Sequence, residues 1–150
     1  MIEFRLGNPD DLERFLPLIQ AYYRYDNHEY DEAKVRRALN GLLHDARSGL
    51  AWLIEDQDEA VGYAVVCFGY SLEFGGRDAF IDELYLDEQH RGQGIGARMI
   101  EHMAQVCRDQ GVQALHLEVM PGNNEVIRLY ARAGFVNRGS SLMSRYLTAQ

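Results

Sequence analysis

A glycine-rich segment between an apolar strand and a helix constrains this chain more than any other feature. Residues 91–96 read Arg-Gly-Gln-Gly-Ile-Gly and join a strand expected at Phe80 to Leu86 to a helix that begins near Gly94. Closely spaced glycines remove the β-carbons that would keep a ligand off the backbone, so successive amides can converge on an anion. The unpaired amides and dipole of the helix start favour a phosphate, and Arg91 adds a full positive charge. The segment therefore predicts a phosphate or pyrophosphate site.

Two familiar phosphate-binding loops fit this segment less well. A Walker loop requires lysine followed by serine or threonine after its last glycine, and here Gly96 is followed by alanine and arginine. The dinucleotide fingerprint is met by Gly92, Gly94 and Ala97, with Glu118 at a tolerable distance for a ribose-binding acid. A Rossmann sheet would, however, need several more parallel strand–helix units after Glu118, and the chain has room for one helix and a hairpin.

A third reading rests on a family resemblance. The strand at residues 81–86, followed by Arg91-x-x-Gly94-x-Gly96, closely resembles the acetyl-coenzyme A signature of the GNAT superfamily of N-acetyltransferases. A second segment, Asn-x-x-Val-Ile-x-Leu-Tyr at residues 123–130 with Ala-Gly-Phe at 133–135, is similar to that family's second cofactor motif. The two motifs occur in the right order and cover about a third of the chain. Val126 replaces a usual alanine and Asp87 a frequent proline, and neither change removes a group that the chemistry needs.

Hydrophobic periodicity and turn residues predict a mixed α/β layer fold for a single domain over residues 1–150. The expected strands are Ile2 to Leu6, Leu50 to Glu55, Ala60 to Phe68, Phe80 to Leu86, Ala114 to Val119, and a closing hairpin of Phe135 to Asn137 with Leu142 to Leu147. The expected helices run from Asn8 to Tyr23, Glu32 to Arg47, Gly94 to Gln110 and Asn123 to Ala133. The resemblance implies a GNAT-like fold, in which a mixed, mostly antiparallel sheet of about six to seven strands is flanked by about four helices.

Global properties narrow the class of protein. No stretch of about 18 apolar residues could span a membrane, and the N-terminus lacks the features of a secretory signal, so we expect a cytoplasmic protein. Cys67 and Cys107 lack metal-like spacing, so we expect inert thiols and no metal site. The net charge of −8 disfavours nucleic acid and anionic acceptors and favours a cationic amine or basic peptide. The sequence is compatible with a homodimer.

The resemblance implies acetyl-coenzyme A as the cofactor, and its motifs place the binding residues. Backbone groups of the motif strand would hold the pantetheine arm, the glycine segment would hold the pyrophosphate, and the last helix would contribute two further side chains. These residues are Leu84, Tyr85, Leu86, Arg91, Gly92, Gln93, Gly94, Ile95, Gly96, Ala97, Asn123 and Tyr130.

Acyl transfer to an amine needs a proton acceptor and a proton donor but no nucleophilic side chain. The chain has no Gly-x-Ser-x-Gly elbow, so we expect direct transfer in a ternary complex. In a regular strand Glu83 shares the acceptor face with Ile81 and Tyr85, whereas a bulge would bring Asp82 into play. Glu118 is a third candidate carboxylate. Tyr130 matches the position that the resemblance places near the coenzyme sulfur, and a phenol remains protonated at neutral pH.

The acceptor is predicted to lie beside an aromatic and acidic stretch between the first two helices. Tyr22, Tyr25, Asp26 and Tyr30 belong to this stretch, and Glu118 would face it from a neighbouring strand. The expected activity is acetylation of a primary amine, either on a small cationic molecule or on a protein N-terminus or lysine. A nucleotide-dependent oxidoreductase and a non-catalytic sensor of acyl-coenzyme A remain as alternatives.

Overall fold

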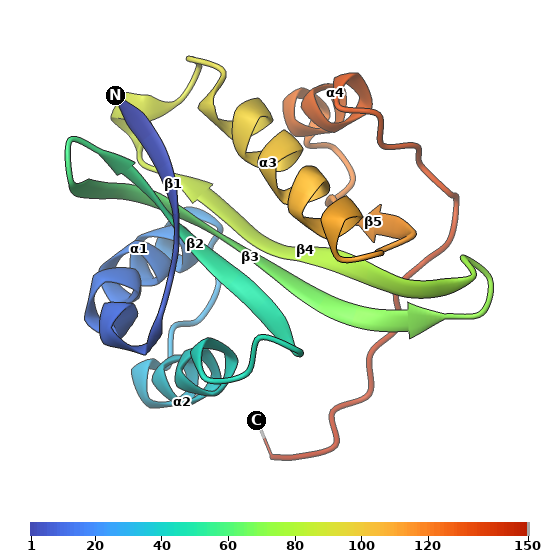
Figure 1. Cartoon of the computed structure of the whole chain (residues 1–150), viewed down its shortest axis with the longest axis horizontal. Helices are drawn as coiled ribbons and strands as arrows, with labels where there is room; N and C mark the ends of the chain where they lie inside the picture. The colour runs from blue at the N-terminus through green and yellow to red at the C-terminus, as the bar shows by residue number, and fades with distance from the viewer. Residues whose placement is uncertain (150) are drawn as a thin grey trace.

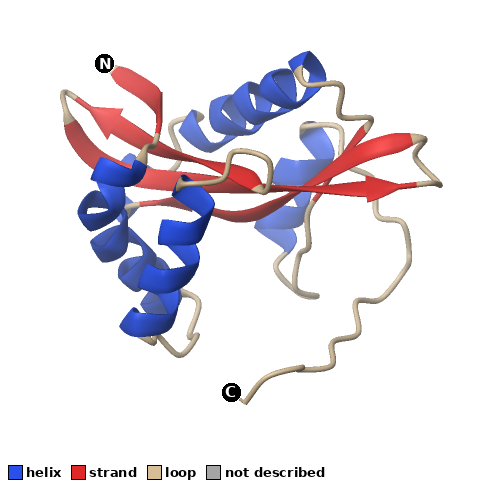
Figure 2. Cartoon of the chain, turned by 60° about the horizontal axis from the view of Figure 1, so that its bottom comes forward, coloured by secondary structure: helices blue, strands red, loops and turns tan. Residues whose placement is uncertain are grey.

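The computed structural model describes residues 1–149 and contains one five-stranded sheet with helices on both faces (Figures 1 and 2). The strands are β1 (Ile2–Leu6), β2 (Gly49–Asp56), β3 (Glu59–Ser71), β4 (Gly76–Leu86) and β5 (Ala114–His116). The α-helices are α1 (Leu12–Tyr25), α2 (Glu32–Leu43), α3 (Ile95–Asp109) and α4 (Asn124–Arg132), and short 3₁₀ turns cover Pro9–Asp11 and Glu88–His90.

The sheet follows the chain in the order β1-β2-β3-β4-β5. The first four strands are antiparallel to their neighbours, and β5 runs parallel to β4 after the α3 crossover. The expected mixed, mostly antiparallel sheet with four helices is therefore confirmed, with five strands among residues 1–149 rather than six or seven.

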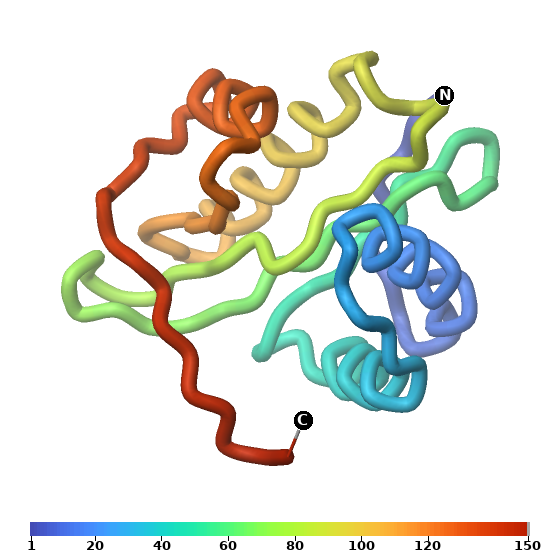
Figure 3. Tube along the Cα trace, turned by 180° about the vertical axis from the view of Figure 1, so that it is seen from behind, coloured from blue at the N-terminus to red at the C-terminus, as the bar shows by residue number. Residues whose placement is uncertain are grey.

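Two apolar clusters fix the layers. On one face, Met99, Ile100 and Met103 of α3 are buried against the sheet, and α4 lies beside α3 (Figures 1 and 3). On the other face, Phe15 and Ile19 of α1 pack with residues of α2 and of the central strands. In both helices the buried residues recur at helical spacing, so each helix buries one face against the sheet.

The predicted C-terminal hairpin is wrong. Residues 135–149 contain neither helix nor strand, and the C-terminal arm, residues 136–149, crosses to the side of the sheet that carries α1 and α2 (Figures 2 and 3). Arg138 holds the start of the arm at the β3–β4 turn, because its Nη2 lies 2.5 Å from a Glu73 oxygen and its guanidinium stacks on Phe74 at 4.7 Å. Leu142 and Met143 consequently remain exposed.

The strand expected at Ala114 to Val119 is also shorter than predicted. Its ladder with β4 begins at Asp78 and ends where Phe80 pairs with His116. Beyond Phe80, β4 pairs with β3 at Ile81 and at residues 83–86 but has no ladder to β5. The sheet therefore opens on one side of β4 beside the glycine segment.

Candidate active site

The glycine segment forms the start of α3 as predicted. Gly92 and Gly94 have φ values of 74° and 81°, a region that side chains with a β-carbon rarely occupy. The first turn of α3 contains no acidic residue, and the N-cap residue, Gly94, has no side chain that could cap the free amides. The helix start therefore presents backbone donors and a partial positive charge to an anion.

Gly96 differs from the other two glycines in having an ordinary backbone conformation. It lies in the first turn of α3, and a β-carbon built there would meet no atom within 4 Å. Neither strain nor packing explains the glycine, whereas a ligand lying close against the helix would. The open space above Gly92, Gly94 and Gly96 is consequently suited to a pyrophosphate.

Side chains at the preceding turn hold the segment in place. Arg91 Nε donates to the Leu86 carbonyl at 2.9 Å, and the Arg91 guanidinium lies 4.2 Å from the Tyr25 ring centre. Arg91 thus braces the loop against α1 in addition to contributing the charge expected from the sequence. His90 lies 2.5 Å from Asp87 and 3.2 Å from Asp56, and these bonds raise the pKa of its imidazole.

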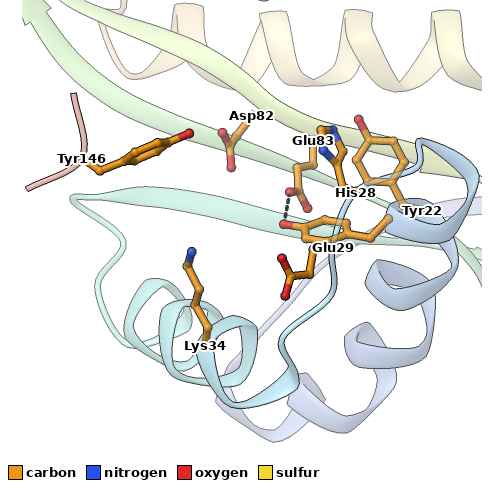
Figure 4. A pocket seen from close by; sticks show the side chains of 8 residues that line it. Tyr22, His28, Glu29, Lys34, Asp82, Glu83 and Tyr146 are labelled. Atoms are coloured by element: carbon orange, nitrogen blue, oxygen red, sulfur yellow. Dashed lines mark hydrogen bonds between the residues drawn. The ribbon is translucent and has the colours of Figure 1, made fainter. Parts of the chain in front are cut away.

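A pocket of about 430 Å³ lies on the α1–α2 side of β4 (Figure 4). Aromatic and charged side chains from α1, the following loop, α2, β4 and the C-terminal arm form its walls. They are Tyr22, Tyr23, His28, Glu29, Lys34, Asp82, Glu83 and Tyr146. Three carboxylates and one lysine give this surface a negative balance that suits a cationic ligand.

A β-bulge at Asp82 explains how two adjacent acids reach one pocket. Val65 of β3 pairs with Glu83, whereas Val66 pairs with Ile81, so Asp82 is the extra residue. The bulge shifts the alternation, and Ile81 faces the α3 cluster rather than sharing a face with Glu83 as expected. Asp82 and Glu83 both line the pocket.

Glu83 is held by two phenols. Tyr63 Oη donates to Glu83 Oε1 at 2.7 Å, and Tyr23 Oη donates to Glu83 Oε2 at 2.7 Å. Burial raises the pKa of Glu83, and the two hydrogen bonds oppose this shift by stabilising the carboxylate. The surroundings of Glu83 therefore fix the orientation of its carboxylate and adjust its pKa, as a proton acceptor requires.

Asp82 is placed differently. Its side chain is exposed at one edge, although the protein around it raises its pKa by desolvation. No hydrogen bond to its carboxylate is found among residues 1–149. The structure therefore brings both predicted carboxylates to the pocket but fixes the geometry of Glu83 alone.

Tyr130 lies on α4, half-buried beside the α3 cluster, with its ring 5.9 Å from that of Phe135. Burial raises the pKa of Tyr130, so the phenol keeps its proton at neutral pH. Burial also raises the pKa of Tyr22 to about 12, and the neighbouring charges of Asp26 and Glu83 add to this shift. Asn123 is the N-cap residue of α4 and makes no capping hydrogen bond with its side chain.

The predicted acceptor residues are only partly brought together. Tyr22 lines the pocket, whereas Tyr25 supports Arg91 and Asp26 pairs with His28 at 2.7 Å. Tyr30 packs against Tyr23 with ring centres 5.9 Å apart and does not line the pocket. Glu118 lies beyond the end of β5, exposed and outside the pocket lining, because the strand that would have carried it ends at His116.

Sequence reasoning missed several residues that line the pocket and also Tyr63, which contacts Glu83 from behind it. Tyr63 resembles any core residue of an alternating strand, and Lys34 any surface lysine of a helix. Tyr146 reaches the pocket only because the arm does not form the expected hairpin. Tyr23 and Glu29 belong to the aromatic and acidic stretch, whose composition was the available signal.

Two further properties concern residues 1–149. No group of three or more His, Cys, Asp or Glu side chains in this range is arranged to hold a metal ion. None of its helices combines the length and apolar character needed to cross a membrane.

Comparisons with known proteins agree with this geometry. A model of the acetyltransferase (GNAT) family matches residues 12–135. The thialysine N-epsilon-acetyltransferase of Bos taurus is 36% identical over 74 residues, which represent 49% of this chain and 43% of that protein. The chain therefore aligns with less than half the length of this relative. The peptidyl-lysine N-acetyltransferase YjaB of Salmonella typhimurium (strain LT2) is 24% identical over 145 residues, covering 94% of this chain and 88% of that protein.

Solved structures show the same fold. The integron cassette protein HFX_CASS3, from the mobile metagenome of Cole Harbour Salt Marsh, has a TM-score of 0.87 and 31% identity, covering 98% of this chain and 91% of that one. A possible acetyltransferase from Clostridium difficile 630 has a TM-score of 0.86 at 19% identity and covers 99% of both chains.

Proposed function

Because this chain belongs to the GNAT acetyltransferase family, we propose that it transfers the acetyl group of acetyl-coenzyme A to a primary amine bound beside Glu83. The observation that carries the proposal is the position of β4, which separates an open glycine-lined helix start from an acidic pocket. Donor and acceptor sites on opposite sides of one strand suit direct transfer in a ternary complex.

Several features of the chain fit the coenzyme. The pyrophosphate would lie over the first turn of α3, where Gly92, Gly94 and Gly96 leave open space. The pantetheine amides would bond to β4 at Leu84 to Leu86, where no ladder to β5 is present. Gln93, Ile95 and Ala97 would contribute backbone contacts in the same loop, and Asn123 would contribute an amide. When bound, acetyl-coenzyme A supplies an activated acyl carbonyl that a neutral amine can attack.

The chain's own residues would manage the protons. Glu83 would accept a proton from the ammonium group of the acceptor, directly or through water, because its carboxylate is fixed in the pocket and has a raised pKa. Tyr130 would donate the proton that the departing thiolate needs. Burial raises the pKa of the Cys67 thiol to about 11, so this neighbouring thiol is a poor nucleophile and fits direct transfer without a covalent enzyme intermediate.

We propose a small cationic amine as the acceptor. Asp82, Glu83 and Glu29 outnumber Lys34 in the pocket, and three tyrosines supply aromatic surface for a cation. The two acetyltransferases compared above are named for a lysine analogue and for peptidyl-lysine, which supports an acceptor nitrogen at the end of a flexible side chain. A lysine or N-terminus of a protein is the alternative acceptor. The free thiols Cys67 and Cys107 suit a reducing compartment such as the cytoplasm.

The test is release of coenzyme thiol from acetyl-coenzyme A with a panel of diamines, amino acids, aminoglycosides and lysine peptides. We expect primary amines to support turnover, and Tyr130→Phe to lower kcat by about 100-fold with little change in coenzyme affinity. Tyr70→Phe is the control, because Tyr70 is exposed and lies outside the pocket. An unaltered kcat in Tyr130→Phe would exclude Tyr130 as the acid, and absence of amine-dependent thiol release would reject the activity.

A further inference from the structure

The strongest unexplained feature of the pocket is a pair of tyrosines behind Glu83. Tyr63 lies on β3 and is 0% exposed, and Tyr23 lies near the end of α1. Their hydroxyl oxygens are each 2.7 Å from a different oxygen of the same carboxylate. Two phenols from separate elements therefore converge on one side chain, although an apolar core would need neither hydroxyl.

The pairing between strands explains how Tyr63 reaches this position. Val65 pairs with Glu83, and Tyr63 pairs with Tyr85, so Tyr63 is the diagonal neighbour of Glu83 on the same face. Tyr22 packs against Tyr63 and Tyr85 with ring centres 6.3 Å and 5.8 Å away. The rings thus fix the direction of the Tyr63 hydroxyl.

Both phenols act as permanent donors. Burial, followed by the charge and hydrogen bond of Glu83, raises the pKa of Tyr63, and the same influences raise the pKa of Tyr23. Each tyrosine therefore stays protonated across the working range of pH and donates to the ionised carboxylate. Loss of one hydroxyl would leave a single phenol to oppose the rise in the pKa of Glu83 that burial and the charge of Asp82 cause.

We propose that Tyr63 and Tyr23 are positioning residues that keep Glu83 ionised near neutral pH and direct its remaining lone pairs toward the acceptor amine. The inference rests on the proposed acetyl transfer, in which Glu83 is the proton acceptor. It also distinguishes the two pocket acids, because Asp82 has no comparable support among residues 1–149. A purely structural role for the tyrosines would instead affect activity equally at every pH.

The test measures the titration of Glu83 and the pH profile of the enzyme in parallel. Carbon-13 NMR of glutamate-labelled protein follows the Glu83 carboxyl, with Glu83→Gln identifying its resonance. In Tyr63→Phe and in Tyr23→Phe we expect the titration midpoint to rise by about one pH unit, since each variant removes a hydrogen bond to a charged group. The acidic limb of kcat/KM should move by the same amount and activity should recover at higher pH. Tyr70→Phe, an exposed tyrosine on the same strand, should change neither.

The outcomes separate this inference from the proposed function. A Glu83 midpoint that is unchanged in both folded Tyr→Phe variants would overturn the positioning role, even if the protein acetylates amines. A raised midpoint without any amine acetylation would support the role of the tyrosines and reject the transferase assignment. Tyr23→Phe provides a second measurement if the fully buried Tyr63→Phe variant does not fold.

Discussion

At the residue scale, Gly96 gives the sharpest test of the coenzyme site. Valine at Gly94 would be strained at a φ of 81° whether or not a ligand binds, so its effect would be ambiguous. Gly96 has neither positive φ nor a neighbour within 4 Å. In Gly96→Val, new methyl groups would occupy the space proposed for the pyrophosphate while the fold is retained.

We therefore expect Gly96→Val to weaken acetyl-coenzyme A binding by at least tenfold, as measured by isothermal titration calorimetry. Gly41→Val is the matched control, because Gly41 lies within α2 and is equally free of neighbours. Comparable melting temperatures for the two variants would show that both fold. Equal coenzyme affinity in Gly96→Val and in the control would contradict the proposed position of the pyrophosphate at the start of α3.

The two pocket carboxylates and the tyrosine behind them were unequally predictable. Glu83 and Asp82 stood out because consecutive acids in an apolar strand have no packing purpose. Tyr63 did not, since an alternating strand often contains a core tyrosine and its diagonal neighbour is set by strand register. The tyrosine–carboxylate contacts depend on distances across three elements, which no local pattern encodes.

At the element scale, the 3₁₀ turn Pro9–Asp11 that leads into α1 depends on a charged cluster away from the pocket. Asp11 forms a capping box with Asn8, and Arg5 Nη2 lies 2.7 Å from its Oδ1. Glu55 of β2 joins the cluster through Arg14 Nη2 at 2.6 Å. The hydrogen bond from Arg5 is the largest influence on Asp11 and lowers its pKa below the ordinary value of 3.8.

Replacement of Asp11 by asparagine should lower the free energy of unfolding by about 2 kcal/mol at neutral pH, because a cap is weakened and Arg5 and Arg14 lose a partner. A depressed folded-state pKa means that the stabilisation is present above pH 3.8 and is lost as pH falls through the lower folded value. Urea unfolding at neutral and acidic pH should therefore show a smaller deficit in acid. Asp10→Asn, at an exposed neighbouring position, is the control, and an equal loss in both variants would contradict the role of the cluster.

The elements themselves were mostly predictable, and the exceptions have physical causes. Helix caps and apolar stripes located all four helices within a few residues. The bulge at Asp82 escaped prediction in detail because one extra residue leaves no compositional mark. The C-terminal residues are rich in apolar side chains, as a strand would be, but composition does not supply a hydrogen-bonding partner, and the contacts of Arg138 hold the arm elsewhere.

At the scale of the whole molecule, the order of elements was sufficient to predict the mixed sheet. Successive antiparallel strands and one parallel crossover place the glycine segment after the end of β4, beyond the short parallel ladder that joins β4 to β5. The opening between β4 and β5 depends on where their ladder ends, which the sequence did not indicate. The acidic pocket likewise required the fold, because its walls come from widely separated segments.

The net charge of −8 should act over the whole surface and draw cationic acceptors toward the pocket. We expect kcat/KM for a cationic amine to fall several-fold between low and physiological salt, because the Debye length shortens to about 8 Å. For an amine of the same length that carries no further charge, kcat/KM should change less with salt. Glu29→Gln, in the pocket wall, should raise KM for the cation, whereas Glu3→Gln, exposed on β1, should leave it nearly unchanged. Preference for an anionic acceptor, with efficiency rising as salt is added, would show that electrostatic attraction does not select the substrate.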